Sequence, residues 1–174
     1  ALARNESVPG MRATTGGSPL ETLVRLWPLQ KPVPAQHLEA ALPGLLDPLA
    51  EGGFIEHVGG RTRALADIRP YADDDGDWWV AADLTPGLDG RIEPVPEDHT
   101  LGVNAAATTL AQLTVRPQVA TALDLGTGCG VEALHLSRHV GRIVATDLSE
   151  RALAFAAITA QLNRLDIDLR QGSL

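Results

Sequence analysis

Cysteine, lysine and long apolar runs are scarce in this 174-residue chain, and each shortage excludes something. The one cysteine, Cys129, cannot form an intrachain disulfide. No stretch comes near the roughly 20 consecutive apolar residues that span a bilayer, and the sequence shows no signal-peptide pattern. The expectation is therefore a cytoplasmic protein without a membrane partner.

Positive charge is scarce as well. The chain has 14 Lys and Arg against 22 Asp and Glu, which gives a formal net charge of -8. Such a surface offers no general attraction to phosphate backbones, so bulk DNA binding is not expected. The hydrophobic content of 44% is enough to bury a core, and the length fits one domain or two small ones.

Composition and turn signals divide the chain into four segments. A polar start rich in Gly, Pro and Ser predicts a flexible leader. A later stretch with three prolines and two Asp/Gly turn signals, TPGLDGRIEPVPED, predicts a linker. The predicted segments are the leader over 1–18, a small α+β domain over 19–83, the linker over 84–100 and an α/β domain over 101–174.

The small domain has the element order of a winged helix. Its three predicted helices cover residues 20–27, 34–42 and 45–50, and a hairpin of FIEHV and RTRALADI follows. The third helix, where a nucleic-acid reader needs basic residues, carries no positive charge. Only Arg61, Arg63 and Arg69 on the wing favour nucleic-acid binding. We therefore favour a protein-binding or packing module for this winged-helix-like domain, with nucleic-acid binding as the alternative.

An acidic connector follows, and within it DWWVAAD reads as one more strand after a turn at Asp75-Gly76. Trp78 and Trp79 point to opposite faces of such a strand, so at most one of them is expected in the core.

The last segment alternates strands and helices. Helix-forming NAAATTLAQL precedes a strand over 119–125, a glycine turn, a helix over 131–139, a strand over 142–147, a helix over 149–165 and a strand over 166–171. This order with short connections predicts parallel strands joined by right-handed crossovers. The fold class is therefore α/β, the N-terminal half of a Rossmann-like doubly wound sheet preceded by the winged-helix-like domain.

A ligand crevice is expected outside the carboxyl ends of these strands, where Asp124 and Asp147 fall. Glycines at 126, 128 and 130 let the backbone approach a ligand closely. Asp147 comes 21 residues after Gly126, about the distance at which an acid reaches a ribose diol in nucleotide folds. The structural alternatives are a plain turn residue for Asp124 and, for Asp147, a residue that merely precedes a helix capped by Ser149.

The spacing also discriminates among ligands. A phosphate-binding P-loop needs a lysine after its glycines, and no lysine follows Lys31. A dinucleotide site is satisfied formally by Gly128, Gly130 and Ala133, but it would leave Asp124 facing a pyrophosphate. A nucleoside that carries an ammonium or sulfonium group suits Asp124 better.

Two phrases carry a family resemblance. DLGTGCG together with VATDLS resembles motif I and the following acidic motif of the class I S-adenosylmethionine-dependent methyltransferases. With ERALAFAAITAQLN, they resemble the branch of the small-domain and release-factor glutamine methyltransferases. The resemblance covers residues 101–174 and implies S-adenosylmethionine as the cofactor. By this resemblance, residues 101–174 are expected to form an incomplete methyltransferase domain.

The resemblance also implies a role for each matching position. Asp124 and the backbone around Gly126, Thr127 and Gly128 hold the methionine end, Asp147 holds the ribose hydroxyls, and Leu148 packs on the adenine. Gly130 is a further cofactor-binding position. Many relatives have an Asp that contacts the adenine amino group where this chain has Ser173, which accepts a weaker hydrogen bond.

The acceptor motif of the resembled branch, N-P-P-[FY], occurs nowhere in these residues, and three of about seven expected strands are present. The catalytic residues are thus unknown. We expect a truncated, inactive part of an enzyme that methylates an amide or amino nitrogen of a protein or RNA. The alternatives are a non-enzymatic winged-helix module, regulatory or nucleic-acid-binding, and an NAD-dependent oxidoreductase.

The remaining reactive side chains suggest no further chemistry. Cys129 is expected to fill space in the glycine turn, because no base is indicated beside it. His135 and His139 lie four residues apart on one predicted helix but lack a third ligand, so we expect no metal site.

Overall fold

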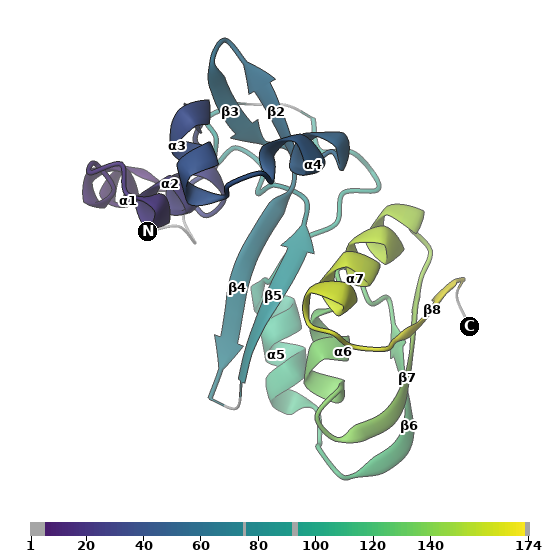
Figure 1. The fold of residues 1–174 in the computed structure, drawn as a ribbon. Helices are drawn as coiled ribbons and strands as arrows, with labels where there is room; N and C mark the ends of the chain where they lie inside the picture. The colour runs from purple at the N-terminus through teal and green to yellow at the C-terminus, as the bar shows by residue number, and fades with distance from the viewer. Residues whose placement is uncertain (1–5, 75, 92–93, 173–174) are drawn as a thin grey trace. The chain divides into compact units, whose positions relative to one another are not determined.

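The computed structural model describes residues 6–74, 76–91 and 94–172, and the chain divides into two compact units (Figure 1). Unit 1 comprises Ala1–Asp67 and Leu84–Val95, and unit 2 comprises Ile68–Asp83 and Pro96–Leu174. The sequence placed residues 68–83 in the first domain and 84–95 in the linker, so both segments group differently in the structure. No described helix is both long and apolar enough to cross a membrane.

Unit 1 combines short helices with a small antiparallel sheet. Its elements are α1 (Val8–Ala13), α2 (Pro19–Leu26), β1 (Val33–Pro34), α3 (Ala35–Ala41), α4 (Leu46–Glu51), β2 (Ile55–Val58) and β3 (Arg61–Ala64), with strand order β1-β3-β2. Helix α2 begins with a capping box, in which Ser18 and Glu21 bond each other's backbone N–H groups. Gly59 and Gly60 both have positive φ, as a tight β2–β3 hairpin turn requires. The winged-helix assignment itself stays a prediction.

Hydrogen bonds from two side chains attach to unit 1 two segments that the sequence assigned to the leader and to the linker. Arg25 donates to the carbonyl oxygens of Thr14 (2.5 Å) and Met11 (2.9 Å), which ties α1 to α2. The predicted leader therefore includes a helix. Lys31 donates to the carbonyl oxygen of Leu88 at 2.8 Å, across 57 residues of sequence. This contact holds part of the predicted linker on unit 1.

Unit 2 contains the parallel sheet predicted from the sequence. Its elements are β4 (Asp67–Asp73, of which Asp67 falls in unit 1), β5 (Gly76–Ala82), α5 (Ala105–Leu113), β6 (Val119–Leu125), α6 (Val131–Leu136), β7 (Val140–Asp147), α7 (Glu150–Leu162) and β8 (Asp168–Gln171). Strands β6, β7 and β8 pair in parallel in that order. The predicted α/β class is confirmed.

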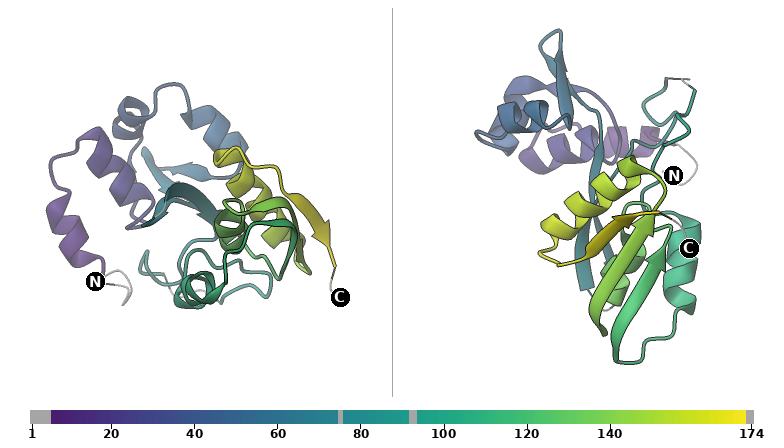
Figure 2. Two further views of the ribbon diagram at one scale, coloured as in Figure 1. Left: turned by 90° about the horizontal axis from the view of Figure 1, so that it is seen from below. Right: turned by 90° about the vertical axis from the view of Figure 1, so that its right-hand side faces the viewer.

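Helices α5, α6 and α7 lie on one side of this sheet (Figure 1). The right-hand view of Figure 2 looks onto the other face, which no described helix covers. Leu123 and Leu125 are 49% and 50% exposed and alternate along β6 with the buried Asp124, so they belong to the uncovered face. A doubly wound sheet carries helices on both faces, and among the described residues helices cover one of the two.

The β4–β5 hairpin packs on α7, where helix side chains form hydrogen bonds with the backbone N–H and C=O groups at the edge of β5. Ala81 N donates to Thr159 Oγ1 at 3.1 Å, and the Asn163 amide accepts from Trp79 N (2.9 Å) and donates to Trp79 O (2.7 Å). Trp78 is buried and Trp79 is 51% exposed, as the alternation along the strand predicts. These contacts explain why residues 68–83 belong to unit 2.

A group of rings fastens the hairpin to α6. The Tyr71 and Trp78 rings stack at 5.6 Å between centroids, and the buried His135 ring meets both edge-on. The Tyr71 hydroxyl lies 2.8 Å from His135 Nε2, and Arg138 stacks on Trp78. Burial lowers the pKa of His135, and Arg116 and Arg138 lower it further, although Asp73 opposes them. The folded state therefore favours the neutral imidazole.

This preference predicts a loss of stability in mild acid. The unfolded histidine takes up a proton near pH 6.5, whereas folded His135 resists it, so stability falls as the pH drops below about 6.5. One proton gives at most about 1.4 kcal/mol per pH unit. Urea unfolding between pH 7.5 and 5.5 measures this slope, which His135→Gln should reduce and the exposed-site control His57→Gln should leave intact. An unchanged slope in His135→Gln would refute the assignment.

Candidate functional site

The glycine turn joins β6 to α6 in a backbone shape that favours glycine. Gly126, Gly128 and Gly130 have φ angles of +72°, +55° and +88°. Gly126 N and Thr127 N both donate to Thr146 O, at 2.8 and 2.9 Å. The turn is therefore fixed against the end of the neighbouring strand β7.

Asp124 lies buried beneath this turn. Its carboxylate accepts a 2.7 Å hydrogen bond from the Thr127 hydroxyl. Burial raises the pKa of Asp124, the hydrogen bond from Thr127 opposes the shift, and the charge of Asp147 adds to it. A positively charged group beside Asp124 would relieve this cost.

Asp147 connects the ends of two strands. Its Oδ2 accepts from Gly128 N at 2.9 Å, and its Oδ1 accepts from Ser149 N at 3.0 Å. Ser149 caps α7 by accepting from Ala152 N at 3.2 Å. Asp147 thus precedes a capped helix and also holds the glycine turn, a contact that the sequence did not reveal.

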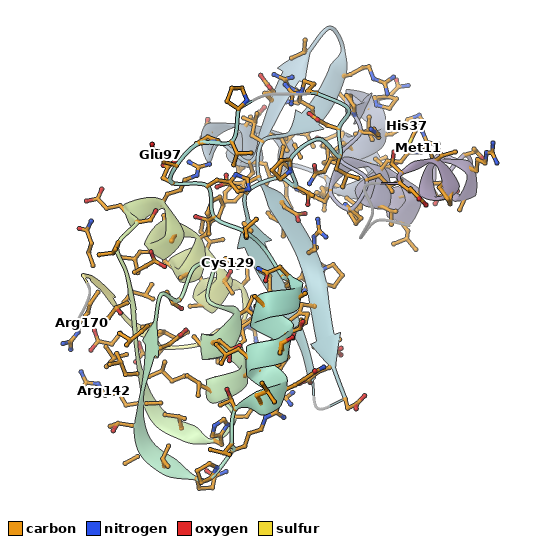
Figure 3. All side chains as sticks on the ribbon, turned by 180° about the vertical axis from the view of Figure 1, so that it is seen from behind. Met11, His37, Glu97, Cys129, Arg142 and Arg170 are labelled. Atoms are coloured by element: carbon orange, nitrogen blue, oxygen red, sulfur yellow. The ribbon has the colours of Figure 1, made fainter. Side chains whose placement is uncertain are left out.

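A pocket of about 480 Å³ opens beside these residues, a size typical of small-ligand sites. Of the predicted cofactor contacts, Asp124, Gly126, Thr127, Gly128 and Asp147 line it. Gly130 and Leu148 do not, and Leu148 is 72% exposed. Ser173 lies outside the described residues. Cys129 is buried in the turn at the start of α6 and also lines the pocket (Figure 3).

Sequence reasoning missed one wall of the pocket. Residues 97–102 and the first turns of α5 line it, although residues 97–100 read as linker. Helix α5 is anchored there by Asn104, whose Oδ1 accepts from Ala106 N (2.9 Å) and Ala107 N (3.1 Å). An Asn before an alanine-rich run is a capping signal that could have marked this boundary.

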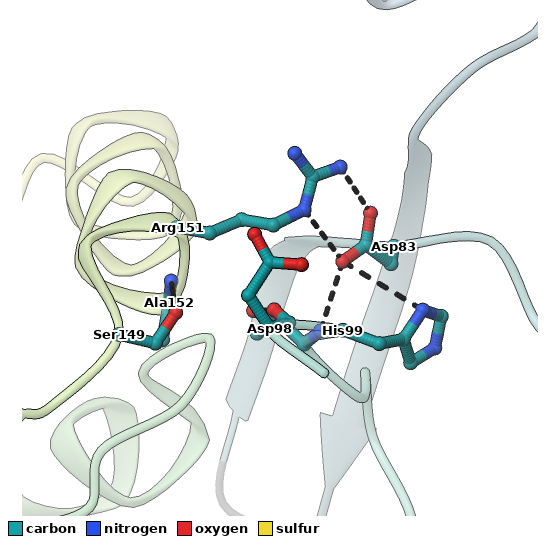
Figure 4. Close-up of polar contacts among 7 residues, drawn as sticks. Asp83, Asp98, His99, Ser149, Arg151 and Ala152 are labelled. Atoms are coloured by element: carbon teal, nitrogen blue, oxygen red, sulfur yellow. Dashed lines mark hydrogen bonds and ion pairs between the residues drawn. The ribbon is translucent and has the colours of Figure 1, made fainter. Parts of the chain in front are cut away.

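Asp83, at the end of β5, holds this wall in place (Figure 4). One carboxylate oxygen accepts from Thr100 N at 2.8 Å and Arg151 Nε at 2.9 Å, and the other accepts from Arg151 Nη2 at 2.5 Å. Burial raises the pKa of Asp83, but the hydrogen bonds from Arg151 and Thr100 outweigh burial and leave the pKa below its usual range. The ionised carboxylate therefore links the wall segment to α7.

Glu132, on α6, is the other residue that the sequence did not identify. It lines the pocket, and its Oε1 is buried without a hydrogen-bond partner in the described part of the chain. Burial and the nearby charge of Asp124 raise the pKa of Glu132 to about 7. The sequence signal that could have identified Glu132 is an acid among the apolar residues of VEALHL.

Charge decides which ligands the pocket can accept. The carboxylates that line it are Glu97, Asp98, Asp124, Glu132 and Asp147, and the described lining includes no Lys or Arg. Such a pocket repels a pyrophosphate and attracts a cation. Its carboxylates can also accept hydrogen bonds from ligand hydroxyls.

Comparisons with known proteins divide the chain in a similar way. Residues 101–174 match the family model of the methyltransferase small domain, and residues 1–65 match a domain of unknown function, DUF7059. No curated protein matches the chain.

Several solved structures resemble part of the chain. The T. thermophilus 16S rRNA N2 G1207 methyltransferase is 16% identical, with 69% of this chain and 34% of that chain covered and a TM-score of 0.36. The ribosomal protein L11 methylase from Lactobacillus delbrueckii subsp. bulgaricus is 28% identical, with 48% and 45% covered and a TM-score of 0.34. The Pyrococcus abyssi tRNA (uracil-54, C5)-methyltransferase is 17% identical, with 61% and 24% covered and a TM-score of 0.38. The chain spans less than half the length of each.

Glu132 should weaken the fold above neutral pH. The unfolded carboxyl ionises near its ordinary pKa, whereas folded Glu132 ionises at about 7, so its contribution to stability falls as the pH rises through that window. Glu132→Gln carries no ionisable group at this position, so at pH 8 it should be more stable than the wild type, by about 1–3 kcal/mol when the shift is discounted for the partial exposure of Glu132. The difference should shrink at pH 5. Urea unfolding at both pH values checks this, and a pH-independent difference would contradict the burial argument.

Proposed function

We propose, from the membership of residues 101–174 in the methyltransferase small domain family, that this chain carries the S-adenosylmethionine-binding part of a methyltransferase. The family match confirms the resemblance of DLGTGCG and VATDLS. The observation that carries the proposal is the acid-lined pocket at the carboxyl ends of β6 and β7.

The charge of the pocket fits this cofactor. S-adenosylmethionine bears an ammonium and a sulfonium and supplies an electrophilic methyl group. Asp124, buried and held by Thr127, gains a counter-charge from the methionine end. The alternative ligand, NAD, would place two phosphates among the same carboxylates, which disfavours an oxidoreductase.

Asp147 has the capacity to hold the ribose. Each of its oxygens accepts one backbone N–H, from Gly128 or from Ser149, and each oxygen has a second lone pair. In our proposal the two ribose hydroxyls donate to these lone pairs. The exposed Leu148 side chain, next in sequence, supplies an apolar surface for the adenine. Ser173 is proposed as a further adenine contact on its sequence position alone.

The methyl acceptor in this proposal is an amide or amino nitrogen of a protein or RNA, as in the branch that the motifs resemble. The acceptor motif N-P-P-[FY] is absent from these residues. We propose that elements completing the acceptor site pack on the uncovered face of the sheet, because Leu123 and Leu125 leave an apolar surface half exposed there. The winged-helix-like domain would then help to select the substrate. The 174 residues alone should bind the cofactor without methylating an acceptor.

The sharpest test replaces Asp147. Asp147→Asn removes the charge and one acceptor oxygen, so affinity for S-adenosylmethionine should fall by about 10- to 100-fold, the usual value of hydrogen bonds to a charged group. Isothermal titration calorimetry of the whole chain measures it.

The matched control is Asp166→Asn, the same change at an exposed position of unit 2. This variant should bind as the wild type does. Equal affinity in Asp147→Asn and the wild type, or tighter binding of NAD than of S-adenosylhomocysteine, would count against the proposal.

A further inference from the structure

Unit 1 has a cavity of its own, of about 170 Å³. The side chains that give it chemistry are three threonines, two arginines and a histidine: Thr14, Thr15, Thr22, Arg25, His37 and Arg61. Its described lining includes no Asp or Glu, although the whole chain carries a net charge of -8. From this composition we propose that the cavity, called here the arginine–threonine pocket, binds a phosphate group.

One arginine is held in position before any ligand arrives. Arg25 Nε donates to Thr14 O (2.5 Å) and Thr14 Oγ1 (3.0 Å), and Nη2 donates to Met11 O (2.9 Å). Within the described residues, Nη1 has no acceptor. A guanidinium fixed on one side presents its remaining N–H groups at low entropic cost, and this geometry suits phosphate oxygens.

The second arginine comes from a different element. Arg61 begins β3 and donates through Nη2 to Pro32 O, next to β1. His37, on α3, also lines the cavity, with its Cε1 3.4 Å from where a Cβ on Gly17 would lie (Figure 3). The three side chains come from separate elements and meet at one cavity.

The hydroxyl groups supply neutral donors. Thr14 is already used, since it donates to Gly10 O at 2.8 Å. Thr22 also lines the cavity, where its hydroxyl can donate to a phosphate oxygen.

The Glu21 carboxylate is hydrogen-bonded outside the cavity. Glu21 accepts from Gly16 N (3.1 Å) and Ser18 N (2.9 Å) as part of the capping box, and these bonds lower its pKa. It does not line the cavity. The charge of Arg25 also lowers the pKa of Glu21, so these two groups partly offset each other, whereas no acid in the described lining faces Arg61.

Size favours a small ligand group. The cavity of about 170 Å³ is smaller than the roughly 300–1,000 Å³ of pockets that enclose drug-sized ligands, and it suits a phosphate group. The phosphate belongs either to a small phosphorylated molecule or to a nucleic-acid backbone that passes the opening. This inference does not depend on the proposed cofactor site.

The test is a titration of the whole chain with inorganic phosphate, with sodium chloride at matched ionic strength as the reference. Binding is followed by calorimetry and by the rise in melting temperature that a ligand of the folded state produces. Saturable binding with a dissociation constant of a few millimolar or tighter is expected. No saturable binding up to about 20 mM would overturn the proposal.

Two variants locate the phosphate. Arg61→Gln and Thr22→Val should each weaken binding by about tenfold, the usual effect of removing one charged or buried hydrogen bond. The matched control is Arg63→Gln, on the same strand but paired with Glu56 and outside the cavity, and it should bind as the wild type does. Equal losses in Arg61→Gln and Arg63→Gln would reveal surface electrostatics only and overturn the proposal.

A second titrant separates the two sources of phosphate. If a short single-stranded RNA competes with inorganic phosphate and loses affinity in Thr22→Val, the pocket takes a backbone phosphate. If inorganic phosphate binds and the RNA does not compete, the ligand is a small phosphorylated molecule. Both results support a phosphate site in the arginine–threonine pocket.

Discussion

The Asp147 carboxylate is the contact on which the candidate cofactor site depends. By accepting from Gly128 N and Ser149 N, it joins the end of β6 to the end of β7 and to the start of α7. The positive φ angles of the glycines give the turn the shape that brings Gly128 N to this carboxylate. Asp124 and Thr127 then lie beneath the turn in one arrangement. A ligand that bonds Asp147 would therefore contact a side chain that already holds the backbone at the ends of both β6 and β7.

Sequence patterns predicted the parts of unit 2 that local rules determine. The β-α-β-α-β order, the glycine turn and the opposite faces of Trp78 and Trp79 all follow from periodicity and short connections. The attachment of the hairpin does not, because Ala81 meets Thr159 and Trp79 meets Asn163 across 78 and 84 residues. No motif encodes such a pairing of strand backbone with helix side chains.

The pocket itself was predictable only in part for the same reason. Asp124 and Asp147 were identified because strand ends in a parallel sheet converge. The wall at residues 97–102 read as linker, since its position depends on Asp83, which accepts from Thr100 and Arg151. Glu132 escaped notice because one acid in an amphipathic run is ordinarily a solvated residue. Its buried, unpaired oxygen shows that this part of the fold tolerates a destabilising charge beside Asp124, which is common where a site binds a ligand.

The Lys31 contact with the Leu88 carbonyl gives the chain an unusual chemical property. Lys31 carries the only side-chain amine in the sequence, and that amine bonds the segment that returns to unit 1. A reagent selective for amines therefore has a single side-chain target in this sequence. The rate of that reaction reports how often the Leu88 carbonyl releases the amine, so a single acylation measurement follows the opening of this one contact within unit 1.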